Sequence, residues 1–140
     1  MTKKENSILA SEKGFTLVEI IAVLVILGIL SAVALPKFMD LQNDAREKAA
    51  DAAISEVKAR LSMGYGKYLL QNSKVPTTLV QICAAVDDDD TLPKSGTGDV
   101  PMGDDYTVGL KPATNTFDGT ITVTAVQGET VSVTGTWVLP

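Results

Sequence analysis

An apolar run near the N-terminus constrains this chain more than any other feature. Between Phe15 and Leu35 the sequence holds one charged side chain, Glu19. A helix of this length spans about 30 Å, which matches the hydrocarbon core of a bilayer. An unpaired carboxylate inside such a segment costs free energy, so Glu19 requires an explanation of its own. The run predicts a membrane-spanning helix and argues against a soluble enzyme.

The charges that flank the run predict its orientation. Three lysines precede it: Lys3, Lys4 and Lys13. Lys37 follows it, but Asp40 comes close behind. This bias favours a cytoplasmic N-terminus. An ordinary secretory signal would have a shorter apolar segment and a cleavage site after it, for which Ser31–Ala34 is only a superficial match.

The block Lys13-Gly14-Phe15-Thr16-Leu17-Val18-Glu19, with Gly28 and Pro36 further along, resembles the N-terminus of type IV prepilins. The spacing of these residues is that of the family. The resemblance implies that a prepilin peptidase removes residues 1–14 by cutting after Gly14. It also implies N-methylation of the new N-terminal Phe15.

The likeness to type IV pilins extends to about Arg60. Residues 34–46, Ala-Leu-Pro-Lys-Phe-Met-Asp-Leu-Gln-Asn-Asp-Ala-Arg, are most similar to the mannose-sensitive haemagglutinin subgroup of type IVa pilins. Many family members close a C-terminal loop with a disulfide. This chain departs from that pattern because Cys83 is its only cysteine.

The resemblance implies that Glu19, Gly28 and Pro36 act in assembly. The apolar helices of many subunits would pack together into a helical homopolymer, replacing the lipid around each helix. Glu19 of an incoming subunit would pair with the amine of a neighbour's Phe15 and set the axial register. The alternative is that Glu19 only snorkels to the membrane surface.

The rest of the chain predicts an α+β head. We expect residues 15–36 to form the transmembrane and filament-core helix, which continues as an amphipathic helix over 37–72. Residues 73–105 are expected to be a loop region with a short second helix over 76–86 and an exposed loop over 91–105. Residues 106–139 alternate with period two and predict an antiparallel meander of three or four strands.

The two apolar faces of the head should pack together, because neither can remain in water. On the helix the face comprises Ile54, Val57, Leu61, Tyr65 and Tyr68. On the meander it comprises Ile121, Val123, Val131, Val133 and Trp137, with Ala125 continuing the alternation.

Composition excludes several kinds of chemistry. The chain has no histidine, which removes histidine-based acid–base catalysis, nucleophile pairs and metal sites. Cys83 lies in an apolar stretch and is interpreted as a buried thiol rather than a nucleophile. The formal charge of −5 makes a nucleic-acid partner unexpected. No cofactor is expected.

The acidic run Asp87, Asp88, Asp89 and Asp90 is the one weak candidate for a metal site. Together with Asp99, Asp104 and Asp105 it could supply oxygen ligands to calcium. The spacing does not follow an EF-hand pattern. A solvated loop at the outer edge of the head is therefore the favoured interpretation, and a catalytic acid pair is less favoured still.

The resemblance to type IV pilins implies a structural protein: a subunit of a type IV pilus with an adhesion or motility role. Its partners would be the membrane before assembly, the prepilin peptidase, an inner-membrane assembly platform and further copies of itself. It would lie in the inner membrane first and in a cell-surface filament afterwards. A pseudopilin of a type II secretion system, a minor pilin and a membrane-anchored binding module remain as alternatives. Glu19 argues against the last, since an isolated anchor is not expected to benefit from it.

Overall fold

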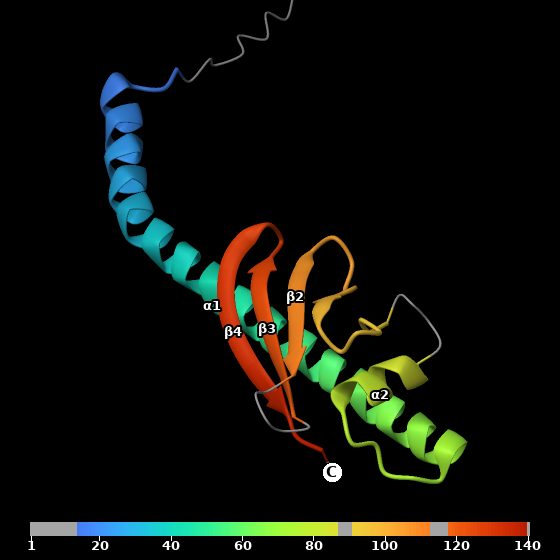
Figure 1. Ribbon diagram of the computed structural model, residues 1–140. Coiled ribbons are helices and arrows are strands. Elements are labelled where there is room, and N and C mark those ends of the chain that lie inside the picture. Colours follow the sequence, from blue (N-terminus) through green and yellow to red (C-terminus); the bar gives the residue numbers. More distant parts are fainter. Residues whose placement is uncertain (1–13, 87–90, 113–117, 140) are drawn as a thin grey trace, which may run out of the picture. The chain divides into compact units, whose positions relative to one another are not determined.

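A single long helix, α1 (Leu17–Asn72), carries both the apolar run and one side of the head in the computed structural model (Figure 1). The structure describes residues 14–86, 91–112 and 118–139. The chain divides into two units, Met1–Asp40 and Leu41–Pro140, and α1 passes from the first into the second. The expected helix is confirmed, and it remains helical through Pro36.

In the first unit the described chain from Gly14 to Asp40 has no buried side chain. α1 begins at Leu17, two residues after the expected start at Phe15. The helix is apolar on all sides here, which is the pattern of a helix that lies in lipid or inside an assembly.

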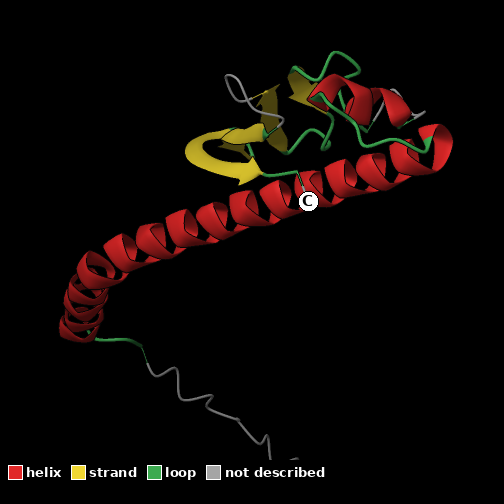
Figure 2. Cartoon of the chain, turned by 60° about the horizontal axis from the view of Figure 1, so that its bottom comes forward, coloured by secondary structure: helices red, strands yellow, loops and turns green. Residues whose placement is uncertain are grey.

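In the second unit α1 packs on a four-stranded antiparallel sheet of strand order β1-β2-β3-β4 (Figure 2). The strands are β1 (Gly98–Val100), β2 (Tyr106–Pro112), β3 (Gly119–Val126) and β4 (Glu129–Trp137). A short helix, α2 (Leu79–Ala85), completes the head. The α+β fold predicted from the sequence is confirmed.

The predicted contact between helix and meander is also confirmed. The fully or nearly buried residues come from α1, α2, the sheet and the segment before β1. They include Ile54, Val57, Leu61, Ile82, Leu92, Val108, Leu110, Ile121, Val123 and Trp137. Tyr65, Val131 and Val133 are partly buried against this cluster, as their places on the two expected faces require. Burying each large side chain contributes about 1.5–3 kcal/mol.

The expectation of an exposed loop over residues 91–105 was partly wrong. Gly98–Val100 form β1, which pairs with β2 from Gly98 opposite Leu110 to Val100 opposite Val108. Leu92 and Val100 are buried. A three-residue strand is too short to show a period-two pattern, so only its pairing with β2 reveals it.

One residue of the predicted inner face of the meander was wrong: in β3 the buried residue is Val126 and not Ala125. Relative to β2, β3 has one extra residue between Val123 and Ala125, which shifts the alternation, so Val126 is buried while Ala125 is only partly buried. An extra residue in one strand shifts which side chains face the core beyond it. Gln127 (φ 53°) and Gly128 (φ 77°) then form the tight turn into β4. Positive φ at both positions is characteristic of a type I′ hairpin turn.

Two glycines let backbones approach α1 closely. A Cβ atom added at Gly135 would overlap Cγ2 of Ile54, so β4 crosses α1 where no side chain fits between them. A Cβ added at Gly64 would lie 2.8 Å from the carbonyl oxygen of Ile82. The backbone of α2 therefore packs directly on α1 at this glycine. Both contacts depend on the absence of a methyl group.

Arg60 ties α1 to the segment that leads into the sheet. Its Nε donates to Oε1 of Glu56 at 3.0 Å, as the i,i+4 spacing predicts. Its Nη1 donates to the carbonyl oxygens of Thr91 at 3.2 Å and of Pro101 at 2.9 Å. The side chain is 18% exposed, so these bonds are partly shielded from water. Arg60 therefore holds both ends of segment 91–101 without a disulfide.

Two further side chains behave as core residues. Cys83 is buried in α2, and burial raises the pKa of its thiol to about 11, which suits an unreactive apolar group. The indole Nε1 of Trp137 donates to Oγ of Ser62 at 3.1 Å, so its polar atom is satisfied where the ring enters the core.

Candidate functional site: the start of the long helix

The bond between Gly14 and Phe15 lies outside the helix and is accessible. Both residues are exposed, and the exposed fraction of Phe15 is 78%. A Cβ added at Gly14 would meet no atom within 4 Å. No contact within the described chain therefore requires glycine at this position.

Thr16 caps α1. The backbone N–H of Glu19 is donated to Thr16 Oγ1 at 3.2 Å, and Glu19 and Ile20 donate to the Thr16 carbonyl at 3.1 and 3.3 Å. Thr16 and Glu19 thus stand at the two positions of a capping box, which stabilises a helix start. The Ser/Thr-x-x-Glu pattern before an apolar run was available in the sequence, and our sequence interpretation missed it.

This capping corrects one step of the sequence argument. A carboxylate in the first turn interacts favourably with the helix dipole by roughly 0.3–1 kcal/mol when exposed. Glu19 lies in that first turn. It therefore benefits a single chain, and its presence alone does not argue against an anchor that never polymerises.

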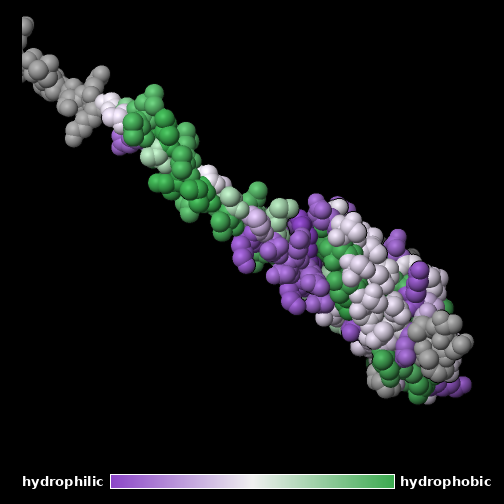
Figure 3. Space-filling view, turned by 90° about the vertical axis from the view of Figure 1, so that its left-hand side faces the viewer, coloured by the Kyte–Doolittle hydropathy of each residue, from purple (hydrophilic) through white to green (hydrophobic). Residues whose placement is uncertain are grey.

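The helix beyond Glu19 exposes a continuous apolar surface, seen as the green section in Figure 3. Its most apolar window has a mean hydropathy of 2.8, and none of that window is buried inside the chain. This is the one helix of the described residues that is long and apolar enough to cross a membrane. Water cannot solvate such a surface favourably, so lipid or other helices must cover it.

Gly28 and Pro36 lie inside this helix. A Cβ at Gly28 would meet nothing within 4 Å, so no contact within the chain requires glycine there. Pro36 lacks a backbone donor and yet stands in helical conformation. The two residues lower the cost of opening the intervening turns.

The acidic residues considered for calcium binding form no metal site among the described residues. Asp87–Asp90 lie outside the described residues. Asp99, Asp104 and Asp105 are exposed. Among the described residues no group of three or more possible ligands could hold a metal ion.

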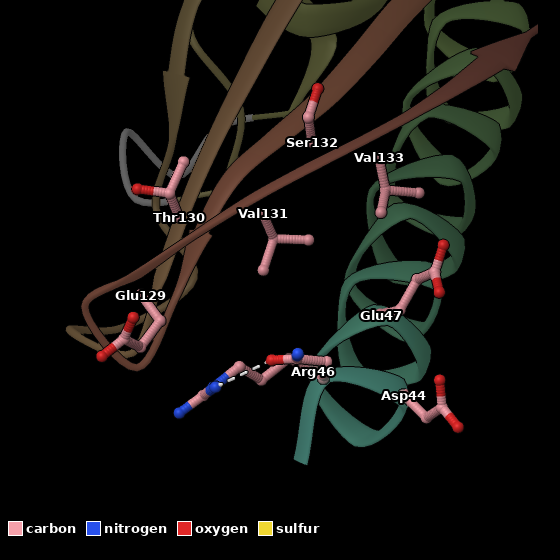
Figure 4. Close-up of a pocket in the computed structure, with 9 residues that line it drawn as sticks. Asp44, Arg46, Glu47, Glu129, Thr130, Val131, Ser132 and Val133 are labelled. Carbon is pink, nitrogen blue, oxygen red and sulfur yellow. Dashed lines mark hydrogen bonds between the residues drawn. The ribbon is translucent and has the colours of Figure 1, made fainter. Parts of the chain in front are cut away.

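A polar groove runs between α1 and β4 at one end of the head (Figure 4). It has a volume of about 360 Å³ and is lined by Asn43, Asp44, Arg46, Glu47 and residues 129–133. Nη1 of Arg46 donates to Oδ1 of Asn43 at 3.4 Å, drawn as the dashed line. An open groove of this kind offers no enclosed apolar pocket for a small molecule.

Comparison with known proteins agrees with this geometry. Residues 9–35 match the family model of the prokaryotic N-terminal methylation motif. The chain is 40% identical over 65 residues to a type IV narrow pilus major component, PilA5, of Thermus thermophilus; the match covers 46% of this chain and 53% of that protein.

The chain is similar to type II secretion proteins as well. It is 36% identical over 83 residues to type II secretion system core protein G of Dickeya chrysanthemi, covering 59% of this chain and 52% of the relative. For core protein G of Pseudomonas aeruginosa the identity is 40% over 67 residues, covering 48% and 44%. No solved structure matches the chain.

The chain spans about half the length of these curated relatives. The matched motif includes Gly14, Phe15 and Glu19, the residues that the structure places at and just before the start of α1. The methylation motif and both kinds of relative support a type IV pilin-like protein.

Proposed function

We propose that this chain is a structural subunit of a type IV pilus filament and not an enzyme. The observation that carries the proposal is the exposed apolar helix that begins at Leu17, two residues beyond an accessible Gly14-Phe15 bond. The similarity to a type IV pilus major component supports it. The likeness of residues 34–46 to the mannose-sensitive haemagglutinin subgroup makes an adhesive filament our specific choice.

The precursor would first lie in the inner membrane. Apolar residues at the centre of a membrane helix favour insertion by roughly 0.3–0.6 kcal/mol each. The apolar window of α1 has no side chain buried within the chain, so this segment would gain most of its stability from the surrounding lipid. It can leave the lipid only when helices of other subunits cover the same surface, with the help of an assembly platform in that membrane. The product is a cell-surface filament.

Processing would prepare the subunit for that exchange. Prepilin peptidase cuts after Gly14, and Phe15 acquires a new amine that is then N-methylated. The cationic amine would lie four residues before Glu19, because Phe15 stands two residues ahead of the first residue of α1. In an apolar filament core, the amine of one subunit and the carboxylate of another would pair and fix their relative height.

Gly28 and Pro36 would let the helix adjust in the filament. The single subunit is helical across both residues. Loss of helical bonds between them would lengthen the chain, because an extended residue spans about twice the 1.5 Å rise of a helical one. The head could then shift relative to a fixed core. A filament map with unbroken helical bonding from Gly28 to Leu35 would contradict this step.

A pseudopilin of a type II secretion system is the second candidate. The observation in its favour is the match to core protein G of Dickeya chrysanthemi, which extends over 83 residues. The two candidates share the proposed processing and differ in the structure that the subunits build. A minor pilin would differ from both by its low abundance in the filament.

Deleting the gene distinguishes these functions. A pilus subunit predicts loss of surface filaments by electron microscopy with an unchanged set of secreted proteins. A pseudopilin predicts a changed set of secreted proteins with unchanged surface filaments. Intact mass of the mature protein, taken from filaments or membranes, should correspond to a methylated chain that begins at Phe15; any other N-terminus would overturn the proposed processing.

A further inference from the structure

The polar groove between α1 and β4 carries charges of both signs that do not pair with one another. The charged side chains that line it are Asp44, Arg46, Glu47 and Glu129. The ion pairs within the described residues join other side chains of α1. The groove therefore presents one guanidinium and three carboxylates to a ligand.

Arg46 is the cationic side chain of the groove. It is half-buried and reaches from α1 toward the start of β4, where Glu129 lies (Figure 4). Its one hydrogen bond among the described residues joins Nη1 to Oδ1 of Asn43 at 3.4 Å, which is long for such a bond. A guanidinium has five N–H donors in a planar fork that matches the oxygens of a phosphate. Most of these donors therefore remain available for an anion.

The lining as a whole favours a zwitterion over a simple anion. Three carboxylates and one guanidinium give it a net charge of −2, which opposes a ligand that is only anionic. Arg46 and Glu129 lie at the same end of the groove without forming an ion pair, so the space between them suits a ligand that carries both charges.

The acceptors in the groove select the kind of cation. Quaternary ammonium groups bind to aromatic side chains, and none of the lining residues is aromatic. The carboxylate of Glu129 and the hydroxyls of Thr130 and Ser132 accept hydrogen bonds instead. A primary ammonium group, which donates three such bonds, fits this lining better than a quaternary one.

The position of the groove along α1 indicates the source of this ligand. Exposed apolar side chains continue along the helix to Leu41, and the groove begins at Asn43. With Glu19 at one surface of the hydrocarbon layer, its thickness of about 30 Å corresponds to roughly 20 helical residues and ends near Met39. Asn43 to Glu47 then follow about 6–12 Å farther along the helix, beside a headgroup layer roughly 5–8 Å thick.

The direction of the side chains brings the groove nearer to the headgroups. Side chains of a helix tilt toward its N-terminus, which for Arg46 is the direction of the membrane segment. The groove is also open, and an open site holds a small free molecule weakly. A lipid, in contrast, is kept beside the helix by its acyl chains, which raises the effective concentration of its headgroup.

We propose that the polar groove binds the phosphoethanolamine headgroup of a membrane lipid. The guanidinium of Arg46 donates to the phosphate oxygens, and the ammonium group donates to the carboxylate of Glu129. Asp44 and Glu47 disfavour lipids with a net negative charge. The inference rests on the proposed function, because the membrane-embedded precursor is the form that meets such a lipid. It assigns the head a contact of its own with the membrane surface.

Nuclear magnetic resonance of the isotope-labelled full-length chain in dodecylmaltoside micelles tests the site. Phosphatidylethanolamine should shift the Nε–H signal of Arg46 and the amide signals of Thr130 and Ser132 in a saturable way. Phosphatidylcholine should bind several-fold more weakly, because its quaternary ammonium donates no hydrogen bond. Absence of saturable shifts with phosphatidylethanolamine, equal affinity for the two lipids, or tighter binding of phosphatidylglycerol would overturn the proposal.

Three variants test the assigned roles, and their amide spectra show whether each is folded. Arg46→Gln should weaken the binding of phosphatidylethanolamine about tenfold, the change expected when charge-assisted bonds are lost. Glu129→Gln should abolish the preference over phosphatidylcholine. Lys48→Gln is the matched control, because this exposed cation of α1 pairs with Asp51 outside the groove and should not affect binding. Unchanged affinity in Arg46→Gln, unchanged preference in Glu129→Gln, or an equal loss in Lys48→Gln would refute the site.

Glycerophosphoethanolamine, the same headgroup without acyl chains, separates a lipid from a free zwitterion. It should bind at least tenfold more weakly than the lipid, and a comparable affinity would contradict a lipid ligand. Surface filaments on cells are counted separately by electron microscopy. Filaments built by a chain that does not bind the lipid would reject this inference and keep the proposed function. Lipid binding by a chain that builds no filaments would reject the proposed function and keep the headgroup site.

Discussion

Gly135→Ala tests how tightly β4 is held against α1. The added methyl group would overlap Cγ2 of Ile54 and lie 3.5 Å from Cε of Lys58. Ile54 is 5% exposed and belongs to the core, so it has little room to move. Overpacking of a core costs about 1–3 kcal/mol, while replacing a strand glycine by alanine alone gains about 0.5–1 kcal/mol. We therefore expect a net loss of about 1–2 kcal/mol.

Thermal unfolding of the head, residues 41–140, followed by circular dichroism measures this loss. For a domain of this size, 1 kcal/mol lowers Tm by about 4–8 °C. Gly109→Ala is the matched control in β2, because its Cβ would meet only a carbonyl oxygen at 3.9 Å. That variant should be as stable as the parent or slightly more stable.

A double-mutant cycle identifies the cause. Ile54→Ala alone should cost about 2–5 kcal/mol by leaving a cavity. In the presence of Ile54→Ala the methyl group at position 135 has space, so Gly135→Ala should cost less there than in the parent, with a coupling of about 0.5–3 kcal/mol. If Gly135→Ala leaves Tm unchanged or raises it, the close crossing of β4 over α1 is wrong.

Four further outcomes follow from the structure. Trp137→Ala should destabilise the head by about 3–5 kcal/mol. Trp137→Phe loses the bond to Ser62, which should cost about 1 kcal/mol in addition to the cost of the smaller buried apolar area. An alanine variant with the same Tm as the parent would place the ring outside the core. Gln127→Asn should raise Tm slightly, because asparagine tolerates the positive φ of the type I′ turn better, and a lower Tm would contradict the turn assignment. Glu19→Ala should leave membrane insertion and cleavage intact but abolish most filament assembly, so normal filament yield by electron microscopy would remove its proposed role in register. Cys83 should react slowly with iodoacetamide at pH 8, since burial raises the pKa of its thiol from 9.0 to about 11; the unfolded chain ionises first, so stability should fall as the pH rises from 9 to 11.

Long periodic elements were the part of this fold that sequence could predict. α1 and the strands β2 to β4 each repeat an apolar pattern over enough residues for the period to be recognised. The three-residue β1 has no such pattern, and its existence depends on the partner strand. Similarly, one register irregularity exchanged the places of Ala125 and Val126, which alternation alone cannot anticipate.

The candidate site was predicted in a different way. Gly14, Phe15 and Glu19 were identified by their resemblance to a family motif, and the structure adds that the bond expected to be cut is exposed and that Thr16 caps the helix. The cap could have been predicted from the four residues Thr16-Leu17-Val18-Glu19 alone. By contrast, the bonds of Arg60 to Thr91 and Pro101 join residues 31 and 41 positions apart. A sequence pattern contains no information on which carbonyl a distant arginine will reach.

The bonds of Arg60 to segment 91–101 affect which residues of that segment can be substituted during evolution. Its Nη1 binds carbonyl oxygens, which every amino acid provides, and neither acceptor is a side chain. Exposed residues of the segment, such as Lys94, Ser95 and Asp99, can be replaced without removing those two acceptors. A covalent crosslink would instead require a cysteine at a fixed place within the segment. The exposed side chains of this segment are therefore free to vary, while one arginine on the helix preserves the attachment beneath them.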